Sequence, residues 1–305
     1  MKSEKNMKSE KSMNRLGIAA FLFACGLSFD ALAVESTSTE AVEVENTVTD
    51  MIEAVAESTP GQESTEDLRK AAQNPVASMI SVPFQNNTDF NIGPDNKTKN
   101  TLNIQPVWPF ELNDEWNLIT RTILPLVSQP ALLPGQERTF GLGDTTLTAF
   151  LSPKEHGKIA WGAGPMFLLP TATDDMLGAD KWGLGISGVA LTVIDKWTIG
   201  ALVSNIWSVA GSGDNDINLF TLQYFVNYNL EGGWYLVTAP INTANWEADS
   251  DNQWTVPLGG GAGRVFNIGK QPVNAQLSAY YNVETPDNFG AEWQMRAQIQ
   301  FLFPK

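Results

Sequence analysis

The chain has 305 residues, of which 43% are hydrophobic and 17% are charged, and its net charge is −15. A single cysteine excludes a disulfide framework and a thiolate zinc site, and a single histidine argues against His-rich metal sites and Ser–His catalysis. The negative charge argues against binding to nucleic acid. We therefore predict no catalytic residue, no metal site and no cofactor. Ten tryptophans are far more than a chain of this size ordinarily carries.

The first residues have the order of a secretory signal peptide. A basic stretch ending at Arg15 precedes an apolar run, residues 16–29, and Ala31-Leu32-Ala33 provides a cleavage site between small residues. The apolar run is too short to span a bilayer by itself. We predict a signal peptide over residues 1–33 and an exported mature protein. Cys25 is either a lipidated cysteine or a thiol without a role.

Residues 34–75 form an acidic arm. From Val34 to Lys70 there are ten Asp or Glu residues and no Trp, Tyr or Phe. Ser64 and Asp67 form a capping box before residues 68–72, so a short helix is predicted there, ended by Asn74-Pro75. A narrow apolar stripe at helical spacing precedes it: Val44, Val48, Met51, Ile52 and Val55. The arm is therefore either a solvated, partly disordered segment or an amphipathic one that packs on a partner or plugs a pore.

After residue 75 the pattern changes to two-residue alternation, which is typical of β-strands with two unlike faces. In residues 293–303 the odd positions are Trp, Met, Ala, Ile, Phe and Phe, and the even positions through residue 300 are Gln, Arg, Gln and Gln. We predict twelve strands, at residues 76–86, 100–112, 116–129, 142–152, 158–170, 182–194, 197–209, 217–230, 234–246, 253–267, 272–284 and 291–303.

The connections between these strands alternate in length. Short turns such as Asn113-Asp114-Glu115 and Asp195-Lys196 alternate with longer loops, the first of which is expected near residues 87–99. Short turns alternating with long loops on an even number of strands are characteristic of bacterial outer-membrane barrels. The predicted fold is therefore all-β: a twelve-stranded antiparallel transmembrane β-barrel over residues 76–305, with the acidic arm on the periplasmic side and the long loops outside.

The tryptophans all fall near predicted strand ends. An indole ring has an apolar body and one N–H donor, so it suits the boundary between hydrocarbon and headgroups. Phe303 ends the last strand in the same way. The predicted interface aromatics are Trp108, Trp116, Trp161, Trp182, Trp197, Trp207, Trp234, Trp246, Trp254, Trp293 and Phe303.

The opposite faces of the strands carry mostly uncharged polar residues with a few charges. A ring of charge, which is typical of ion-selective pores, is not evident. This composition favours a narrow passage or pocket for small uncharged or aromatic molecules over an open salt-conducting pore, with a lumen packed by its own side chains as the alternative. The predicted lumen-lining residues are Asn103, Gln105, Arg121, Asp144, Gln223, Asn227, Asn274, Gln276, Tyr280, Gln294, Arg296, Gln298 and Gln300.

Several short motifs resemble a known family. They are Ala72-Gln73-Asn74-Pro75-Val76-Ala77 followed by residues 80–87, Asn103 to Pro109, Gly141-Leu142-Gly143-Asp144 and Gly162-Ala163-Gly164-Pro165. These resemble outer-membrane barrel proteins labelled as belonging to the meta-pathway of phenol degradation, some of which are mislabelled as neuromedin-like. The resemblance covers residues 70–305, implies uptake of aromatic or hydrophobic compounds, and brings no established catalytic residue with it. The acidic stretch at residues 34–65 falls outside it.

We therefore predict a bacterial outer-membrane channel or transporter that passes small uncharged, hydrophobic or aromatic solutes passively. The alternatives are a structural barrel without transport and a barrel lipase, which needs a Ser–His pair near the outer rim, whereas His156 is expected in a periplasmic turn. The expected partners are outer-membrane lipid and lipopolysaccharide, a small hydrophobic or aromatic solute, and the barrel-assembly machinery through the C-terminal strand. Nucleic acid is not expected as a partner.

Overall fold

The computed structural model describes residues 64–133, 135–213, 216–287 and 289–304. The predicted signal peptide, Cys25 and the apolar stripe of the acidic arm before Ser64 lie outside these residues. None of the helices in the described part of the chain has the length and apolarity needed to cross a bilayer.

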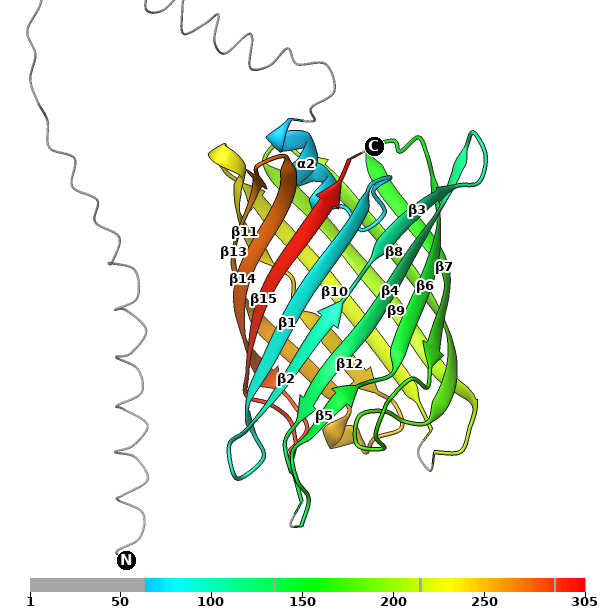
Figure 1. Cartoon of the computed structure of the whole chain (residues 1–305), viewed down its shortest axis with the longest axis vertical. Helices are drawn as coiled ribbons and strands as arrows, with labels where there is room; N and C mark the ends of the chain where they lie inside the picture. Colours follow the sequence, from blue (N-terminus) through cyan, green and yellow to red (C-terminus); the bar gives the residue numbers. More distant parts are fainter. Residues whose placement is uncertain (1–63, 134, 214–215, 288, 305) are drawn as a thin grey trace, which may run out of the picture. The chain divides into compact units, whose positions relative to one another are not determined.

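The described residues form one antiparallel β-barrel with a short helix, α2 (Thr65–Ala72), at one end (Figure 1). Three wall strands are interrupted, as β2–β3, β5–β6 and β11–β12, so that fifteen strand segments make the predicted twelve-stranded barrel. The segments are β1 (Ile80–Ile92), β2 (Lys97–Ile104), β3 (Val107–Glu111), β4 (Trp116–Gln129), β5 (Thr139–Leu142), β6 (Thr145–Pro153), β7 (Ile159–Leu169), β8 (Lys181–Ile194), β9 (Trp197–Gly211), β10 (Asn218–Asn229), β11 (Trp234–Thr238), β12 (Ile241–Asn245), β13 (Trp254–Ile268), β14 (Gln271–Glu284) and β15 (Trp293–Phe303).

The first and last strands close the barrel. β1 pairs with β15 in continuous antiparallel register from Ile80↔Phe303 to Phe90↔Trp293. On the outer face of this seam the rings of Phe84 and Phe301 meet edge to face, with centroids 6.0 Å apart. Every other wall strand pairs with its neighbour in sequence, so the sheet has no open edge. Closure satisfies the backbone N–H and C=O groups that would otherwise face hydrocarbon.

The first strand differs from its prediction at both ends. It runs from Ile80 to Ile92 instead of 76–86, because residues 76–79 leave the wall and enter the mouth of the barrel. The long loop expected near residues 87–99 is instead the tight turn 93–96, in which Gly93 and Asn96 have positive φ. The polar run Asn86 to Asp89 reads as loop in sequence, but its residues pair on both sides with β15 and β2.

Two of the three interruptions lie at prolines. Pro106 separates β2 from β3, and Pro240 separates β11 from β12. Proline has no N–H to donate, so each break is where a ladder hydrogen bond is lost. The third break, at Gly143-Asp144, separates β5 from β6. The predicted single strands over 100–112, 142–152 and 234–246 are therefore each divided in two.

Alternating side chains face lipid and lumen. On β14 Leu277, Tyr281 and Val283 are exposed outside, whereas Asn274 and Ser278 are buried inside. This is the face assignment that the sequence alternation predicts, and it makes the outside of the wall apolar.

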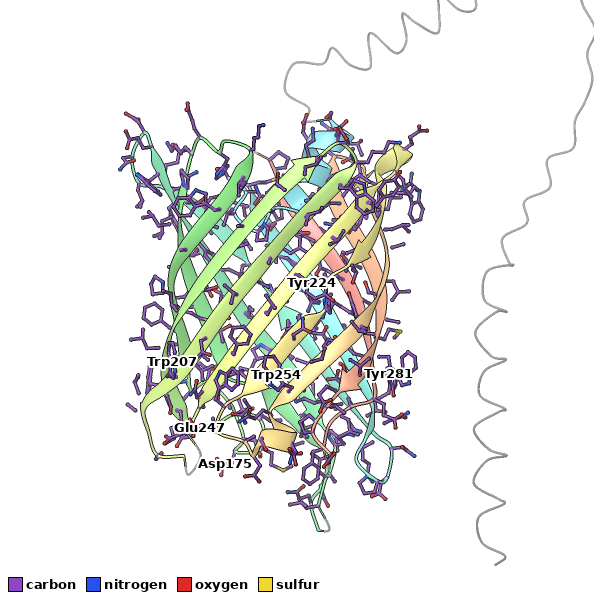
Figure 2. All side chains as sticks on the ribbon, turned by 180° about the vertical axis from the view of Figure 1, so that it is seen from behind. Asp175, Trp207, Tyr224, Glu247, Trp254 and Tyr281 are labelled. Atoms are coloured by element: carbon purple, nitrogen blue, oxygen red, sulfur yellow. The ribbon has the colours of Figure 1, made fainter. Side chains whose placement is uncertain are left out.

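The ten tryptophans lie in two belts near the two ends of the strands. Each belt is joined by ring contacts within it: Trp116 meets Trp161 at the end with the short turns, with centroids 6.0 Å apart, and Trp246 meets Trp254 at the other end, 5.5 Å apart. Figure 2 shows Trp207, Trp254 and Tyr281 near the long-loop end, while Tyr224 lies further along the wall. The first belt comprises Trp108, Trp116, Trp161, Trp197 and Trp234, and the second Trp182, Trp207, Trp246, Trp254 and Trp293.

Gly263 makes room for a tyrosine ring inside the barrel. A Cβ at this position would overlap the ring of Tyr235, which is 2% exposed and donates a hydrogen bond to Asn274 Oδ1 at 2.7 Å. The glycine thus lets an aromatic ring lie flat against the inner wall.

We expect Gly263→Ala to lower the free energy of unfolding by about 1–3 kcal/mol, because the added methyl group forces Tyr235 from its site. Urea unfolding of the refolded barrel, followed by gel mobility, measures this change. Gly188→Ala is the matched control, since the nearest atom to its new methyl group is 4.0 Å away. Equal midpoints for the two variants would contradict the account of Gly263.

Candidate functional site: the lumen cavity

Residues 64–79, here called the mouth segment, lie across the end of the barrel that has the short turns. Ser64 caps the N-terminus of α2, and its side chain accepts a hydrogen bond from the backbone N–H of Asp67 at 3.1 Å, as the capping box predicts. The amphipathic helix buries Leu68 against the barrel and leaves Glu66 and Lys70 outside as a 3.0 Å ion pair. That ion pair lowers the pKa of the Glu66 carboxyl.

The rest of the mouth segment descends from the helix into the barrel. Val76 is fully buried beside Phe150 and Gly162, and Met79 joins the same apolar cluster. Each such buried aliphatic side chain contributes about 1.5–3 kcal/mol relative to exposure. Hydrogen bonds fix the register of the segment: Gln73 donates to Asn229 Oδ1 at 3.0 Å, and Ser78 accepts from Asn117 at 2.8 Å. The mouth segment is therefore an integral part of the lumen.

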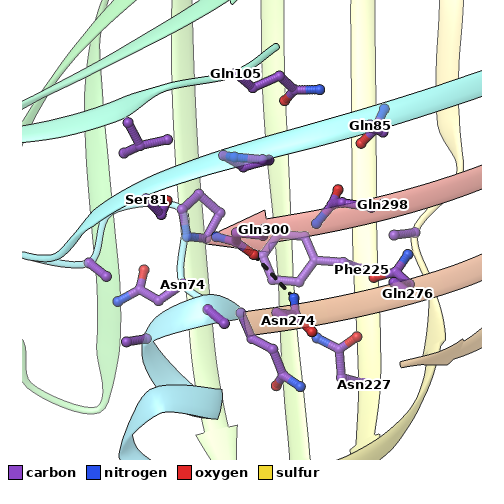
Figure 3. A pocket seen from close by; sticks show the side chains of 18 of the residues that line it. Asn74, Ser81, Gln85, Gln105, Phe225, Asn227, Asn274, Gln276, Gln298 and Gln300 are labelled. Carbon is purple, nitrogen blue, oxygen red and sulfur yellow. Dashed lines mark hydrogen bonds between the residues drawn. The ribbon is translucent and has the colours of Figure 1, made fainter. Parts of the chain in front are cut away.

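Between the mouth segment and the wall lies a cavity of about 160 Å³ (Figure 3). One side is built from the mouth segment, and the other from inward residues of the wall strands β1, β3, β4, β9, β10, β11, β14 and β15. Its lining combines side-chain amides with apolar groups, and among the described lining residues the only charged ones are two arginines. The lining is Ala71 to Pro75, Ala77, Met79, Ser81, Pro83, Gln85, Gln105, Val107, Arg121, Leu202, Gln223, Phe225, Asn227, Tyr235, Ala239, Asn274, Gln276, Arg296, Gln298 and Gln300.

Arg296 is held by its neighbours. Its guanidinium donates to Asn87 Oδ1 at 3.1 Å, to the carbonyl of Ala239 at 2.7 Å and to Gln294 Oε1 at 3.1 Å. The same group lies over the ring of Tyr280, 5.0 Å from its centroid, and Gln294 in turn donates to Asp89. Arg296 therefore ties β15 to β1 and to the carbonyl just before Pro240, where the wall is interrupted.

Arg121 makes fewer contacts. Its Nη2 donates to Gln105 Oε1 at 2.6 Å, the one hydrogen bond recorded for this side chain within the described residues. None of the ion pairs in the described part of the chain involves it. A guanidinium has five N–H donors in a planar fork, so most of the donors of Arg121 are not used by the protein.

Nine of the thirteen predicted lumen residues line this cavity: Gln105, Arg121, Gln223, Asn227, Asn274, Gln276, Arg296, Gln298 and Gln300. Asn103, Asp144, Tyr280 and Gln294 do not line it. Tyr280 and Gln294 support Arg296 from behind. The Asp144 carboxylate instead accepts backbone N–H groups of Ala172 and Ala179, at 3.2 and 2.8 Å, and so holds the loop between β7 and β8.

The sequence pattern did not indicate residues 76–79, Gln85, Phe225 or Tyr235 as part of a site, although an arm over residues 34–75 that plugs a pore was one of its two alternatives. Phe225 departs from the apolar-out alternation of its strand, and this departure was the available signal for a ring that faces inward. Residues 76–79 carry no such signal, because the alternation places them at the start of the predicted strand 76–86.

His156 lies in the turn between β6 and β7, at the end of the barrel where the mouth segment enters. Partial burial lowers the pKa of its imidazole. Within the described residues no hydrogen bond joins it to a serine, and its Nδ1 is buried without a partner. This position is opposite to the outer rim, where a barrel lipase would need its histidine. The described residues also hold no group of three or more His, Cys, Asp or Glu side chains that could bind a metal ion.

Residues 82–292 match a family described as the putative MetA-pathway of phenol degradation. The chain belongs to this family. Its fold is that of a bacterial outer-membrane β-barrel, as in an outer membrane channel from Pseudomonas putida F1, which is 19% identical over 75% of this chain and 97% of that one, with a TM-score of 0.59. No curated protein matches the chain.

Two more distant barrels also match. The outer membrane phospholipase A of Escherichia coli is 14% identical over 79% of this chain and 97% of that one, with a TM-score of 0.40. The toluene transporter of P. putida is 10% identical over 80% of this chain and 95% of that one, with a TM-score of 0.37.

We expect Arg296→Gln to lower the free energy of unfolding by about 3 kcal/mol, because it removes charge-assisted hydrogen bonds and leaves buried acceptors unpaired. Arg264→Gln is the matched control. Arg264 lies on the outer face over the ring of Trp234 and donates one exposed hydrogen bond to the carbonyl of Gly232 at 3.2 Å, so its substitution should cost only about 1 kcal/mol. Urea unfolding in lipid vesicles measures both. A larger loss for Arg264→Gln would show that the Arg296 contacts are not a principal support of the wall.

Proposed function

We propose that the protein is an outer-membrane channel that passes small hydrophobic or aromatic solutes down their concentration gradient. The observation that carries this proposal is the partly open cavity of about 160 Å³ between the mouth segment and the barrel wall. The family description, which refers to phenol degradation, and the likeness to an outer membrane channel also support this function.

The cavity has the size of one ring. A protein cavity of about 150 Å³ is sufficient to hold benzene. A molecule with one aromatic ring and a small substituent therefore matches the space, whereas a sugar chain or a peptide does not. This size supports selection for small solutes at the point where the mouth segment narrows the lumen.

The lining has the two kinds of group that a substituted ring requires. Met79, Val107, Leu202 and Phe225 provide apolar contact, and the amides of residues such as Gln298 provide donors and acceptors for one polar substituent. Passage requires a solute to bind well enough to enter and weakly enough to leave. Neutral amides and apolar contacts meet that condition better than a ring of fixed charges.

Ser81 allows a direct test, because it is 6% exposed and lines the cavity on β1. We expect Ser81→Trp to fill the cavity and to reduce uptake of labelled benzyl alcohol to the rate of protein-free vesicles. The measurement uses full-length protein in vesicles with a lipopolysaccharide outer leaflet, which slows the background entry of apolar solutes.

Val82→Trp is the matched control, since residue 82 is the next position on the strand and points to lipid. It should take up benzyl alcohol at the rate of the unaltered protein. If the unaltered protein takes up no more solute than protein-free vesicles, the chain is a structural barrel and the proposal is wrong. Equal uptake by both tryptophan variants would place the route outside this cavity.

A further inference from the structure

We propose that the lumen cavity prefers aromatic solutes that carry a carboxylate, and that Arg121 binds this group. The inference rests on the proposed function, because it takes the cavity to be the place where a solute binds. It goes further in naming the chemical class of the solute and the residue that recognises it.

The first argument is the position of Arg121. It stands on the inner face of β4, opposite Val107 of β3, and both residues line the cavity. Gln105 accepts one hydrogen bond from the guanidinium and so fixes its orientation without neutralising it. The remaining donors are a planar fork of the kind that binds carboxylates through two parallel hydrogen bonds.

The second argument is the charge of the lining. The chain has 34 acidic residues and 19 basic ones, yet none of the described residues that line the cavity is acidic and two are arginines. A charge taken from water without a counter-charge is costly, so an anion beside an arginine with unused donors lowers that cost. A carboxylate on the solute supplies that anion.

The two arginines differ in how many of their hydrogen-bond donors are free to bind a solute. Arg296 is engaged by Asn87, Ala239 and Gln294, and the nearby carboxylate of Asp89 is joined to it through Gln294. Arg121 has neither a carboxylate nor a backbone carbonyl among its recorded partners. Arg296 is therefore structural, and Arg121 is the group that is left to bind a solute.

The third argument is the apolar contact beside this charge. Val107 lies across the strand pair from Arg121, and Met79 and Phe225 line the same cavity. A ring can therefore contact these side chains while its substituent reaches the guanidinium. The cavity volume limits the solute to about one ring with its carboxylate, as in benzoate, and excludes the whole of a long-chain fatty acid.

The test is equilibrium binding to the full-length protein in lipid nanodiscs, measured by calorimetry at neutral pH with benzoate, benzyl alcohol and benzylamine. These three probes share one ring and differ in charge. We expect benzoate to bind best, and Arg121→Gln to weaken benzoate about tenfold or more, as loss of a charge-assisted contact predicts, while benzyl alcohol changes little. Arg121→Lys, which keeps the charge, should retain part of the preference.

Arg264→Gln is again the matched control, because it removes a guanidinium from the outer face and should leave the order of the three probes unchanged. Heat-modified gel mobility verifies that each variant is folded. Equal affinity of the unaltered protein for benzoate and benzyl alcohol would overturn the inference, and so would an unchanged benzoate preference in Arg121→Gln. Because binding is measured without transport, uptake of benzyl alcohol can succeed while this inference fails, and the reverse can also occur.

Discussion

The structure depends on one constraint: in hydrocarbon, the backbone N–H and C=O groups must find their partners within the protein. A sheet can meet this only by closing on itself, and here the closing contact is the register between β1 and β15. Closure also gives the sheet an outer face toward lipid and an inner face toward the lumen. Side chains that alternate along each strand face lipid or lumen, and the indole rings lie near the two ends of the strands.

A closed wall of this size leaves a narrow interior, and the chain divides that interior into two parts. Near the short turns, Phe150 and Ile119 form an apolar collar that receives Val76 of the mouth segment. Next to it, inward amides surround the cavity. The apolar collar holds the mouth segment in place by burial, whereas the amides offer hydrogen bonds to whatever enters. Both the apolar collar and the amide lining of the cavity are formed by the inward-facing residues of the alternating strands.

The two lumen arginines show how similar residues acquire different roles. Both stand on inward positions of the wall and line the cavity, but Arg296 is buried whereas Arg121 is partly exposed. Arg296 lies where β1, Tyr280 and the carbonyl of Ala239 converge, so its donors are used in holding strands together. Arg121 stands beside a gap that the mouth segment leaves open, so its donors face the cavity. Placement in three dimensions, and not residue type, decides which one can recognise a solute.

Much of the fold could be predicted from the sequence because two-residue alternation and turn residues are local signals. They indicated twelve strands, the two belts of tryptophan and the inward face that carries Gln298 and Gln300. They placed the first strand too early and predicted a long first loop, because a polar run such as Asn86 to Asp89 has no local mark of being paired on both sides. The local signals also predicted Asp144 as a lumen residue. Its hydrogen bonds with Ala172 and Ala179 join positions distant in sequence, so a local pattern could not indicate them.

The sequence by itself therefore determined that this protein is a membrane barrel with a mainly polar interior, because alternation along a strand needs only neighbouring residues to be read. The tertiary structure alone decided that residues 73–79 enter the barrel, that Tyr235 lies against Gly263, and that Arg121 and Arg296 share one cavity. These outcomes depend on the curvature of the closed wall, which brings side chains from distant strands together and is not encoded in any short stretch of the chain.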